Sequence, residues 1–132
     1  MDFRKKTEWL GQLRPLRREI EMLSRRLGEP GPDARASPFE AELAQARRAK
    51  LESRRKRCLE QLGALYAFID DTEDSRMRQI LTCRYIDGMT WKAVAAEIGE
   101  WNEQYPRRLH NRYLEKLERG PEPEGGGEGF DV

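Results

Sequence analysis

The chain has 132 residues, of which 37% are hydrophobic, 37% are charged and only 8% are aromatic. This length corresponds to one domain, and the composition predicts a small core, which argues against a large catalytic pocket. The 25 Lys and Arg residues almost balance the 24 Asp and Glu residues, so the net charge of +1 neither favours nor excludes a nucleic-acid partner.

The distribution of charge along the chain is uneven. Residues 1–57 contain 16 basic and nine acidic side chains, whereas residues 121–132 contain four acidic side chains and no basic one. No segment approaches the ~20 consecutive apolar residues that cross a bilayer. The basic residues near the start are not followed by the apolar run of a signal peptide. We therefore expect a cytoplasmic protein without a membrane contact.

The first predicted element is a helix with one apolar stripe. Its apolar residues follow one another at intervals of 4, 3, 4, 3 and 4, and they are Trp9, Leu13, Leu16, Ile20, Leu23 and Leu27. This spacing is typical of a coiled-coil seam or a helical hairpin. Pro15 either kinks this helix or marks its first turn. Because the stripe continues through Pro15 from Trp9, we expect a kink.

A loop and a long second helix follow. Residues 28–38 contain two glycines and three prolines, which favour a loop. Residues from about Pro38 to Ile69 then repeat apolar positions at heptad-like spacing, namely Ala44, Leu51, Cys58, Leu62, Leu65 and Ile69. Residues 1–69 are therefore predicted to form a helical hairpin. Two basic clusters, at residues 47–50 and 54–57, either form a solvated face or bind phosphate.

The cysteines and a carboxylate cluster are assigned structural roles. Cys58 and Cys83 lie in apolar patterns without CxxC spacing, so we expect buried reduced thiols. Residues 70–74 include four carboxylates directly before an apolar helical pattern, where acidic groups cap free backbone amides. A single histidine and no further ligand cluster argue against a metal site. The capped helix should end at Gly88.

Residues 89–117 have the pattern of a helix-turn-helix. Thr90 is a suitable N-cap for a first helix, Gly99 ends that helix, and Asn102 is a suitable N-cap for a second. The small side chain of Ala95 lets two helices cross closely. We expect the core of this pair to consist of Trp91, Val94, Ala95, Ile98 and Leu109. Trp101 is likewise expected in the core or as a wedge between the helices; stacking on bases is the alternative interpretation for Trp91 and Trp101.

Two stretches resemble the sigma-70 region 4-like domain of phage-encoded regulators of the RinA and ArpU type: CRYIDGMTWKAVA at residues 83–95 and RRLHNR at residues 107–112. The resemblance covers about residues 73–117. It implies a transcriptional regulator that binds DNA in the cytoplasm of a bacterial host cell, typically an activator of late phage genes. The chain departs from that family at Glu100, which looks like an extra turn residue. It departs again at Pro106, which leads us to expect a shortened recognition helix.

The second helix of a helix-turn-helix enters the major groove of DNA. We expect Tyr105, Leu109, Tyr113 and Leu117 to face inward. The outward side chains then predict base contacts from Gln104, Arg107, Arg108 and Asn111, because these side chains can pair with guanine or adenine edges. Phosphate contacts are predicted from Lys92, Arg112 and His110. A neutral, packed His110 is the alternative interpretation.

The whole pattern predicts an all-α protein: a long, coiled-coil-like helical hairpin, a three-helix helix-turn-helix head over residues 70–119, and a disordered acidic tail over residues 120–132. We expect a sequence-specific regulator that binds double-stranded DNA, with no cofactor and no enzymatic activity. The hairpin would serve homo-oligomerisation, contact with host RNA polymerase or an additional grip on phosphate. The alternatives are a DNA-packaging protein similar to a small terminase subunit and a coiled-coil adaptor that binds protein.

Overall fold

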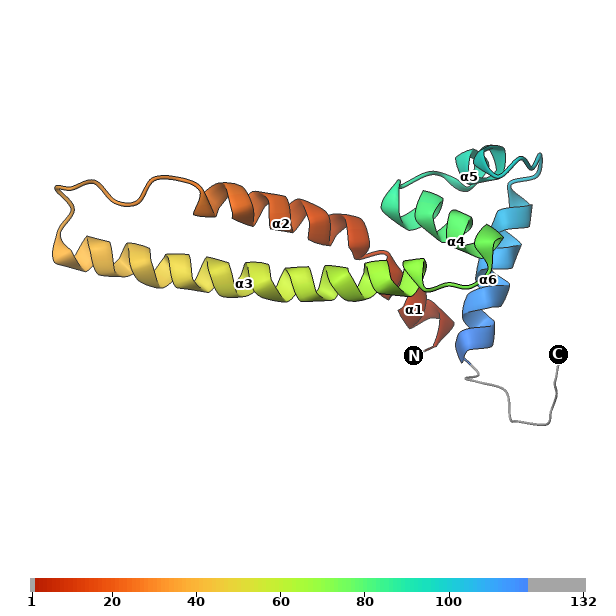
Figure 1. Cartoon of the computed structure of the whole chain (residues 1–132), viewed down its shortest axis with the longest axis horizontal. Coiled ribbons are helices and arrows are strands. Elements are labelled where there is room, and N and C mark those ends of the chain that lie inside the picture. The colour runs from red at the N-terminus through yellow and green to blue at the C-terminus, as the bar shows by residue number, and fades with distance from the viewer. Residues whose placement is uncertain (1, 119–132) are drawn as a thin grey trace. The chain divides into compact units, whose positions relative to one another are not determined.

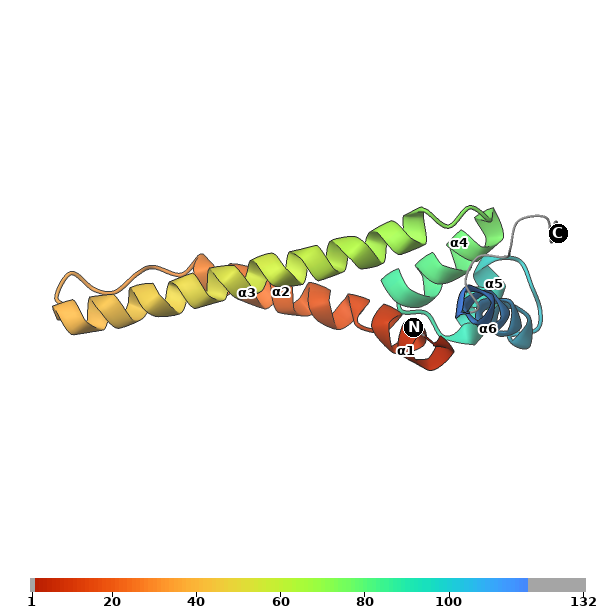
Figure 2. The same cartoon turned by 90° about the horizontal axis from the view of Figure 1, so that it is seen from below.

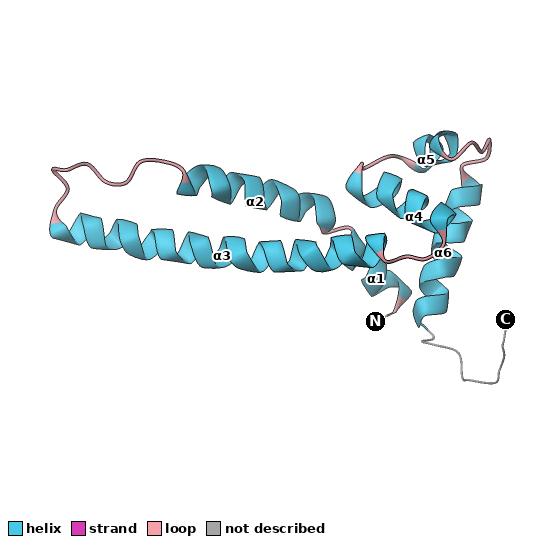
Figure 3. Ribbon diagram, viewed as in Figure 1, coloured by secondary structure: helices cyan, strands magenta, loops and turns pink. Residues whose placement is uncertain are grey.

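The computed structural model of the chain describes residues 2–118, and every regular element in that part is a helix (Figure 3). The prediction of an all-α protein is therefore confirmed. The described residues form two compact units. We call residues 12–68 the hairpin unit, and residues 2–11 together with residues 69–118 the head unit. The predicted tail at residues 120–132 lies outside the described part.

The hairpin unit consists of α2 (Leu13–Leu27), a loop and most of α3 (Pro38–Asp70), and both views show the two helices side by side (Figures 1 and 2). The loop spans residues 28–37, as the glycines and prolines predict. A capping box begins α3, since Ser37 Oγ accepts from the Glu40 amide at 3.1 Å and Glu40 Oε2 accepts from the Ser37 amide at 3.3 Å. Apolar side chains from both predicted stripes form the seam, and the most buried are Leu13, Leu16, Leu23, Cys58 and Leu65.

Two arginines of α3 also face the seam. Arg48 Nη1 donates to the Leu27 carbonyl at 2.8 Å, and Arg55 Nε donates to Ser24 Oγ at 2.8 Å. Both side chains stand at heptad positions where an apolar residue would otherwise pack. Because each cation meets a specific polar group on α2, these two bonds favour one register of the hairpin.

The N-terminal segment differs from the prediction. Residues Phe3–Leu10 form a separate helix, α1, which Asp2 caps by accepting from the Lys5 amide at 2.8 Å. Gly11 and Gln12 interrupt the helix, and α2 begins at Leu13. Pro15 therefore stands in the first turn of α2, where its missing amide hydrogen removes no intrahelical bond. The expected kink at Pro15 is wrong, and residues 2–11 belong to the head unit.

The head unit combines α1 with α4 (Ser75–Leu81), the π-helical turn η1 (Thr82–Ile86), α5 (Trp91–Glu97) and α6 (Gln104–Glu118). Helix α6 packs against α1, α4 and α5. Asp74 caps α4 by accepting from the Met77 amide at 2.8 Å, and Gly88 follows η1 with a positive φ of 71°. Both features match the sequence prediction. The residues with no exposed surface form the core of this unit: Leu10, Ile69, Ile80, Leu81, Val94 and Leu114.

Candidate nucleic-acid interface

Helices α5 and α6 are joined by a tight turn whose backbone bonds are well defined. Thr90 Oγ1 accepts from the Ala93 amide at 3.2 Å, so Thr90 caps α5 as predicted. At the other end, the Glu100 amide donates to the Ala95 carbonyl at 2.8 Å and the Gly99 amide donates to the Ala96 carbonyl at 3.2 Å. These two bonds make a Schellman motif, which requires the positive φ of 78° found at Gly99.

The start of α6 is capped in the predicted way. Asn102 Oδ1 accepts from the Gln104 amide at 2.9 Å. Pro106 is the third residue of α6 and lies in the first turn, where a missing amide hydrogen costs no intrahelical bond. The helix continues for 15 residues, so the expected shortening of the recognition helix is wrong.

The predicted core of the α5–α6 pair is present in part. Val94, Ala95 and Ile98 are buried, whereas Trp91 and Leu109 are half-buried. Because Ala95 is nearly inaccessible and carries only a methyl group, it permits the close approach of the two helices that its position predicts.

The inward face of α6 is displaced by one residue from the predicted one. Its most buried side chains are Pro106, His110 and Leu114, at intervals of four. Of the four residues expected to face inward, Tyr105 is exposed, whereas Leu109, Tyr113 and Leu117 are half-buried. The sequence pattern favoured the aromatic residues, but the compact ring of Pro106 packs into the core instead.

His110 forms part of the core and not of the surface. It is 2% exposed, and the Tyr85 hydroxyl lies 2.7 Å from its Nε2. Its Nδ1 lies 2.8 Å from Asn111 Oδ1, and its ring meets Trp91 edge to face with centroids 5.0 Å apart. Because a phosphate cannot reach this ring, the prediction of His110 as a phosphate contact is corrected, and the alternative of a packed histidine is the one the structure shows.

Burial also determines the protonation of this pair. Loss of solvent lowers the pKa of His110, an effect that the Asn111 hydrogen bond partly offsets and that nearby Arg84 and Arg107 reinforce. Burial raises the pKa of Tyr85 to about 12. Asn111 Oδ1 can only accept, so the imidazole proton is on Nδ1 and the Tyr85 hydroxyl donates to Nε2. The pair is therefore neutral at pH 7.

The other predicted contact residues lie at the surface of α5 and α6. Gln104, Arg107 and Arg108 are exposed in the first half of α6, and Arg108 Nε donates to the Gln104 carbonyl at 3.3 Å. Asn111 is half-buried and already bonded to His110 through its oxygen, which leaves its amide hydrogens for another partner. The two predicted phosphate contacts that remain, Lys92 and Arg112, are exposed.

Two arginines that the sequence analysis did not single out hold the two ends of α5 in place: Arg76 contacts the turn after α5, and Arg84 contacts the start of α5. Arg76 of α4 forms an ion pair with Glu100 at 3.0 Å and lies 5.8 Å from the centre of the Tyr105 ring. Glu100, the apparent extra turn residue, is thus anchored. Arg84 Nη1 donates to the Met89 carbonyl at 2.9 Å, and its guanidinium lies 4.6 Å from the centre of the Trp91 ring. Both contacts join residues from different elements, so no local sequence pattern could have predicted them.

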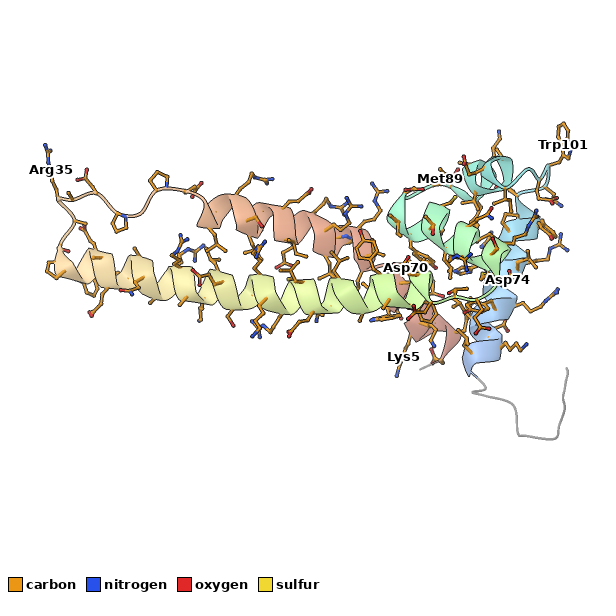
Figure 4. The ribbon with its side chains drawn as sticks, in the orientation of Figure 1. Lys5, Arg35, Asp70, Asp74, Met89 and Trp101 are labelled. Atoms are coloured by element: carbon orange, nitrogen blue, oxygen red, sulfur yellow. The ribbon has the colours of Figure 1, made fainter. Side chains whose placement is uncertain are left out.

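Trp101 is fully exposed, at 102% of its reference surface. Its ring projects into solvent from the turn that precedes α6 (Figure 4). The expectation that Trp101 belongs to the core or forms a wedge is therefore wrong. The whole apolar surface of this ring is therefore open to solvent.

The described part of the chain shows neither a metal site nor a membrane-spanning helix. Among residues 2–118, no group of three or more His, Cys, Asp or Glu side chains could hold a metal ion. In the same part of the chain, no helix is both long enough and apolar enough to cross a membrane. No protein-family model, curated protein or solved structure matches the chain significantly.

Proposed function

We propose that the chain is a sequence-specific regulator of transcription that binds double-stranded DNA through a helix-turn-helix formed by α5 and α6. One observation carries the proposal: Gln104, Arg107 and Arg108 are exposed together in the first half of α6, and that half is rigidly capped at Asn102. In a helix-turn-helix, the N-terminal residues of the second helix contact base edges. Helix α6 contains four basic and two acidic side chains, and both acidic residues, Glu115 and Glu118, lie in its second half, so the first half suits a polyanionic partner.

The side chains divide into two groups by their chemistry. Arg107 and Arg108 can each bond guanine O6 and N7, and Gln104 can bond adenine N6 and N7, with about 1–3 kcal/mol of discrimination for each bidentate pair. Asn111 can donate to a base only through its amide hydrogens, because its oxygen is bonded to His110. Lys92 and Arg112 would bind phosphates, which orient the protein without selecting a sequence.

We add Trp101 to the proposed DNA-binding surface. It stands three residues before the first residue of α6, and its ring makes no core contact that would explain a tryptophan there. Stacking on a base or packing against a deoxyribose would remove its apolar surface from water.

The biological setting is proposed from the resemblance of residues 73–117 to phage regulators of the RinA and ArpU type. On that basis the protein activates late phage genes, with host RNA polymerase as a second partner. A single small head buries limited surface on DNA, so a homodimer on paired half-sites would increase affinity. The small-terminase alternative shares the DNA-binding head and predicts a ring-sized oligomer without promoter-linked sites.

The adaptor alternative has one observation in its favour. The distal end of the hairpin unit holds an open cavity of about 530 Å³ between the end of α2, the loop and α3. Its wall includes the apolar side chains of Leu27 and Leu51, and Arg26 and Arg47 also line it. Such a surface suits an acidic protein segment with an apolar anchor. This alternative predicts only weak, salt-sensitive attraction to DNA.

Selection of bound sequences from a random duplex library tests the proposal. We expect one enriched motif, and Arg107→Ala should relax preference at a single position while costing about 1–3 kcal/mol of binding free energy. Arg112→Ala is the matched control on the same helix, and it should weaken all duplexes alike. The absence of an enriched motif would contradict a sequence-specific regulator and leave the adaptor or a nonspecific role in DNA packaging.

A further inference from the structure

Helix α3 carries the densest cluster of positive charge in the described part of the chain. Residues 47–57 contain seven basic side chains and a single acidic one, Glu52. Two of the seven are used within the hairpin: Arg48 bonds the Leu27 carbonyl and pairs with Glu52 at 3.2 Å, and Arg55 bonds Ser24. The cluster is therefore divided into two groups: Arg48 and Arg55 have partners within the hairpin unit, whereas the other five basic side chains are exposed.

Four of the outward cations lie on one side of α3. Arg47, Lys50, Arg54 and Arg57 follow one another at intervals of three, four and three residues, and all four are exposed. We call these four residues the cation row. At 1.5 Å of rise per residue, the row is about 15 Å long. No carboxylate of residues 2–118 forms an ion pair with any of the four.

We propose that the cation row binds the phosphates of a nucleic-acid duplex without regard to sequence. Four like charges along one helix face repel one another, and a polyanion with regularly spaced charges relieves that repulsion. The hairpin unit contains 13 basic and eight acidic residues, whereas the described head unit contains 11 basic and 12 acidic residues. General attraction to DNA therefore comes from the hairpin. This inference rests on the proposed function only in that it takes a DNA duplex as the partner.

The side chains around the row favour a nucleic acid over an anionic membrane. A helix that lies on a membrane needs a broad apolar face to insert between lipids. Between Arg47 and Arg57, the one large apolar residue is Leu51, which belongs to the half-buried seam stripe facing α2. Within the row, the cations are flanked by Ala46, Ala49 and Ser53, which offer little apolar surface. The exposed Phe39 and Leu43 precede the row on α3, and these two side chains do not form a broad apolar face.

The salt dependence of binding tests the row in the full chain. The row variant combines Arg47→Gln, Lys50→Gln, Arg54→Gln and Arg57→Gln. The control combines Arg17→Gln, Arg18→Gln, Arg35→Gln and Lys56→Gln, which removes the same charge from exposed positions of the hairpin unit outside the row. Circular dichroism checks that both variants retain the helical content of the wild type.

The expected change follows from counterion release. Each phosphate contact contributes about 0.9 to the slope of log K against log salt concentration, so loss of four contacts should reduce that slope by about 3.6. Between 50 mM and 200 mM salt, the wild type should then lose about 150-fold more affinity than the row variant. The same difference is expected on the selected duplex and on a scrambled one. An equal change of slope in the control variant would mean that net charge alone causes the effect. That result would contradict the proposed phosphate binding by the cation row.

The outcomes separate this inference from the proposed function. An enriched motif together with an unchanged slope in the row variant would contradict phosphate binding by the cation row and leave sequence recognition by α6. If no motif is enriched but the slope falls in the row variant alone, that result would contradict a sequence-specific regulator and support phosphate binding by the cation row. Vesicles of phosphatidylcholine and phosphatidylserine form the last arm: if the row variant loses vesicle binding but not duplex binding, the row is a membrane surface and the inference is wrong.

Discussion

At the scale of single residues, the most constrained group in the head unit is His110. It is buried between Tyr85, Trp91 and Asn111, and its pKa is lowered from the ordinary value of 6.5. Below pH 6.5 the unfolded chain therefore binds the proton more strongly than the folded chain. We expect the free energy of unfolding to fall as the pH drops through 6.5, by at most about 1.4 kcal/mol per pH unit, and to level off below the folded pKa.

Urea denaturation between pH 7.5 and 5.5 measures this dependence. His110→Gln provides the control, because glutamine keeps a polar side chain at the site without a proton that titrates in this range. The difference in slope between wild type and variant isolates the contribution of His110 from that of the carboxylates. Parallel curves for the two proteins would contradict the assignment of His110 as a buried neutral base.

Trp101 is the residue whose placement departs furthest from the sequence prediction. Since it is fully exposed, Trp101→Ala should leave the free energy of unfolding unchanged. If its ring stacks on DNA, the same change should weaken duplex binding by about 1–3 kcal/mol, which is roughly 5- to 150-fold. Trp101→Phe should retain part of that affinity. The fluorescence that Trp101 contributes is the difference between the wild type and Trp101→Phe. Iodide should quench this fluorescence, and the duplex should suppress the quenching. Equal duplex affinity of the wild type, Trp101→Ala and Trp101→Phe would exclude the contact.

At the scale of elements, helix ends were predictable wherever the signal is local. Thr90, Gly99 and Asn102 act through bonds to residues at most four positions away, and each does what its position predicts. The register of α6 was not predictable in this way. It depends on where Pro106 stands relative to the first turn, and on a core that draws side chains from α1, α4 and α5.

The break between α1 and α2 shows the same limit. The apolar stripe runs without interruption from Trp9 to Leu27, so periodicity alone predicts one helix. Gly11 and Gln12 interrupt it because Trp9 and Leu13 belong to two different compact units. An apolar stripe indicates which residues are buried, but it does not indicate which element packs against them.

At the scale of the whole molecule, the head unit is built from both ends of the described chain. Helix α1 packs against α6, and Leu10 has no exposed surface. The boundary predicted from sequence would instead assign residues 1–69 to the hairpin. The two boundaries therefore predict different effects of truncating Leu10. The structure predicts that the head unit loses stability, whereas the boundary at residue 69 predicts that the hairpin loses stability.

Leu10→Ala should therefore destabilise the head. Removing a buried leucine side chain costs about 2–5 kcal/mol, and here that loss should increase the hydrogen-exchange rates of α6 amides although Leu10 precedes α6 by more than ninety residues. Leu23→Ala is the matched control, since it truncates a buried leucine of the hairpin seam. It should leave α6 exchange unchanged and weaken protection in α2. If the two variants exchanged these effects, α1 would belong to the hairpin, and the surface proposed to recognise DNA would fold independently of the N-terminal helix.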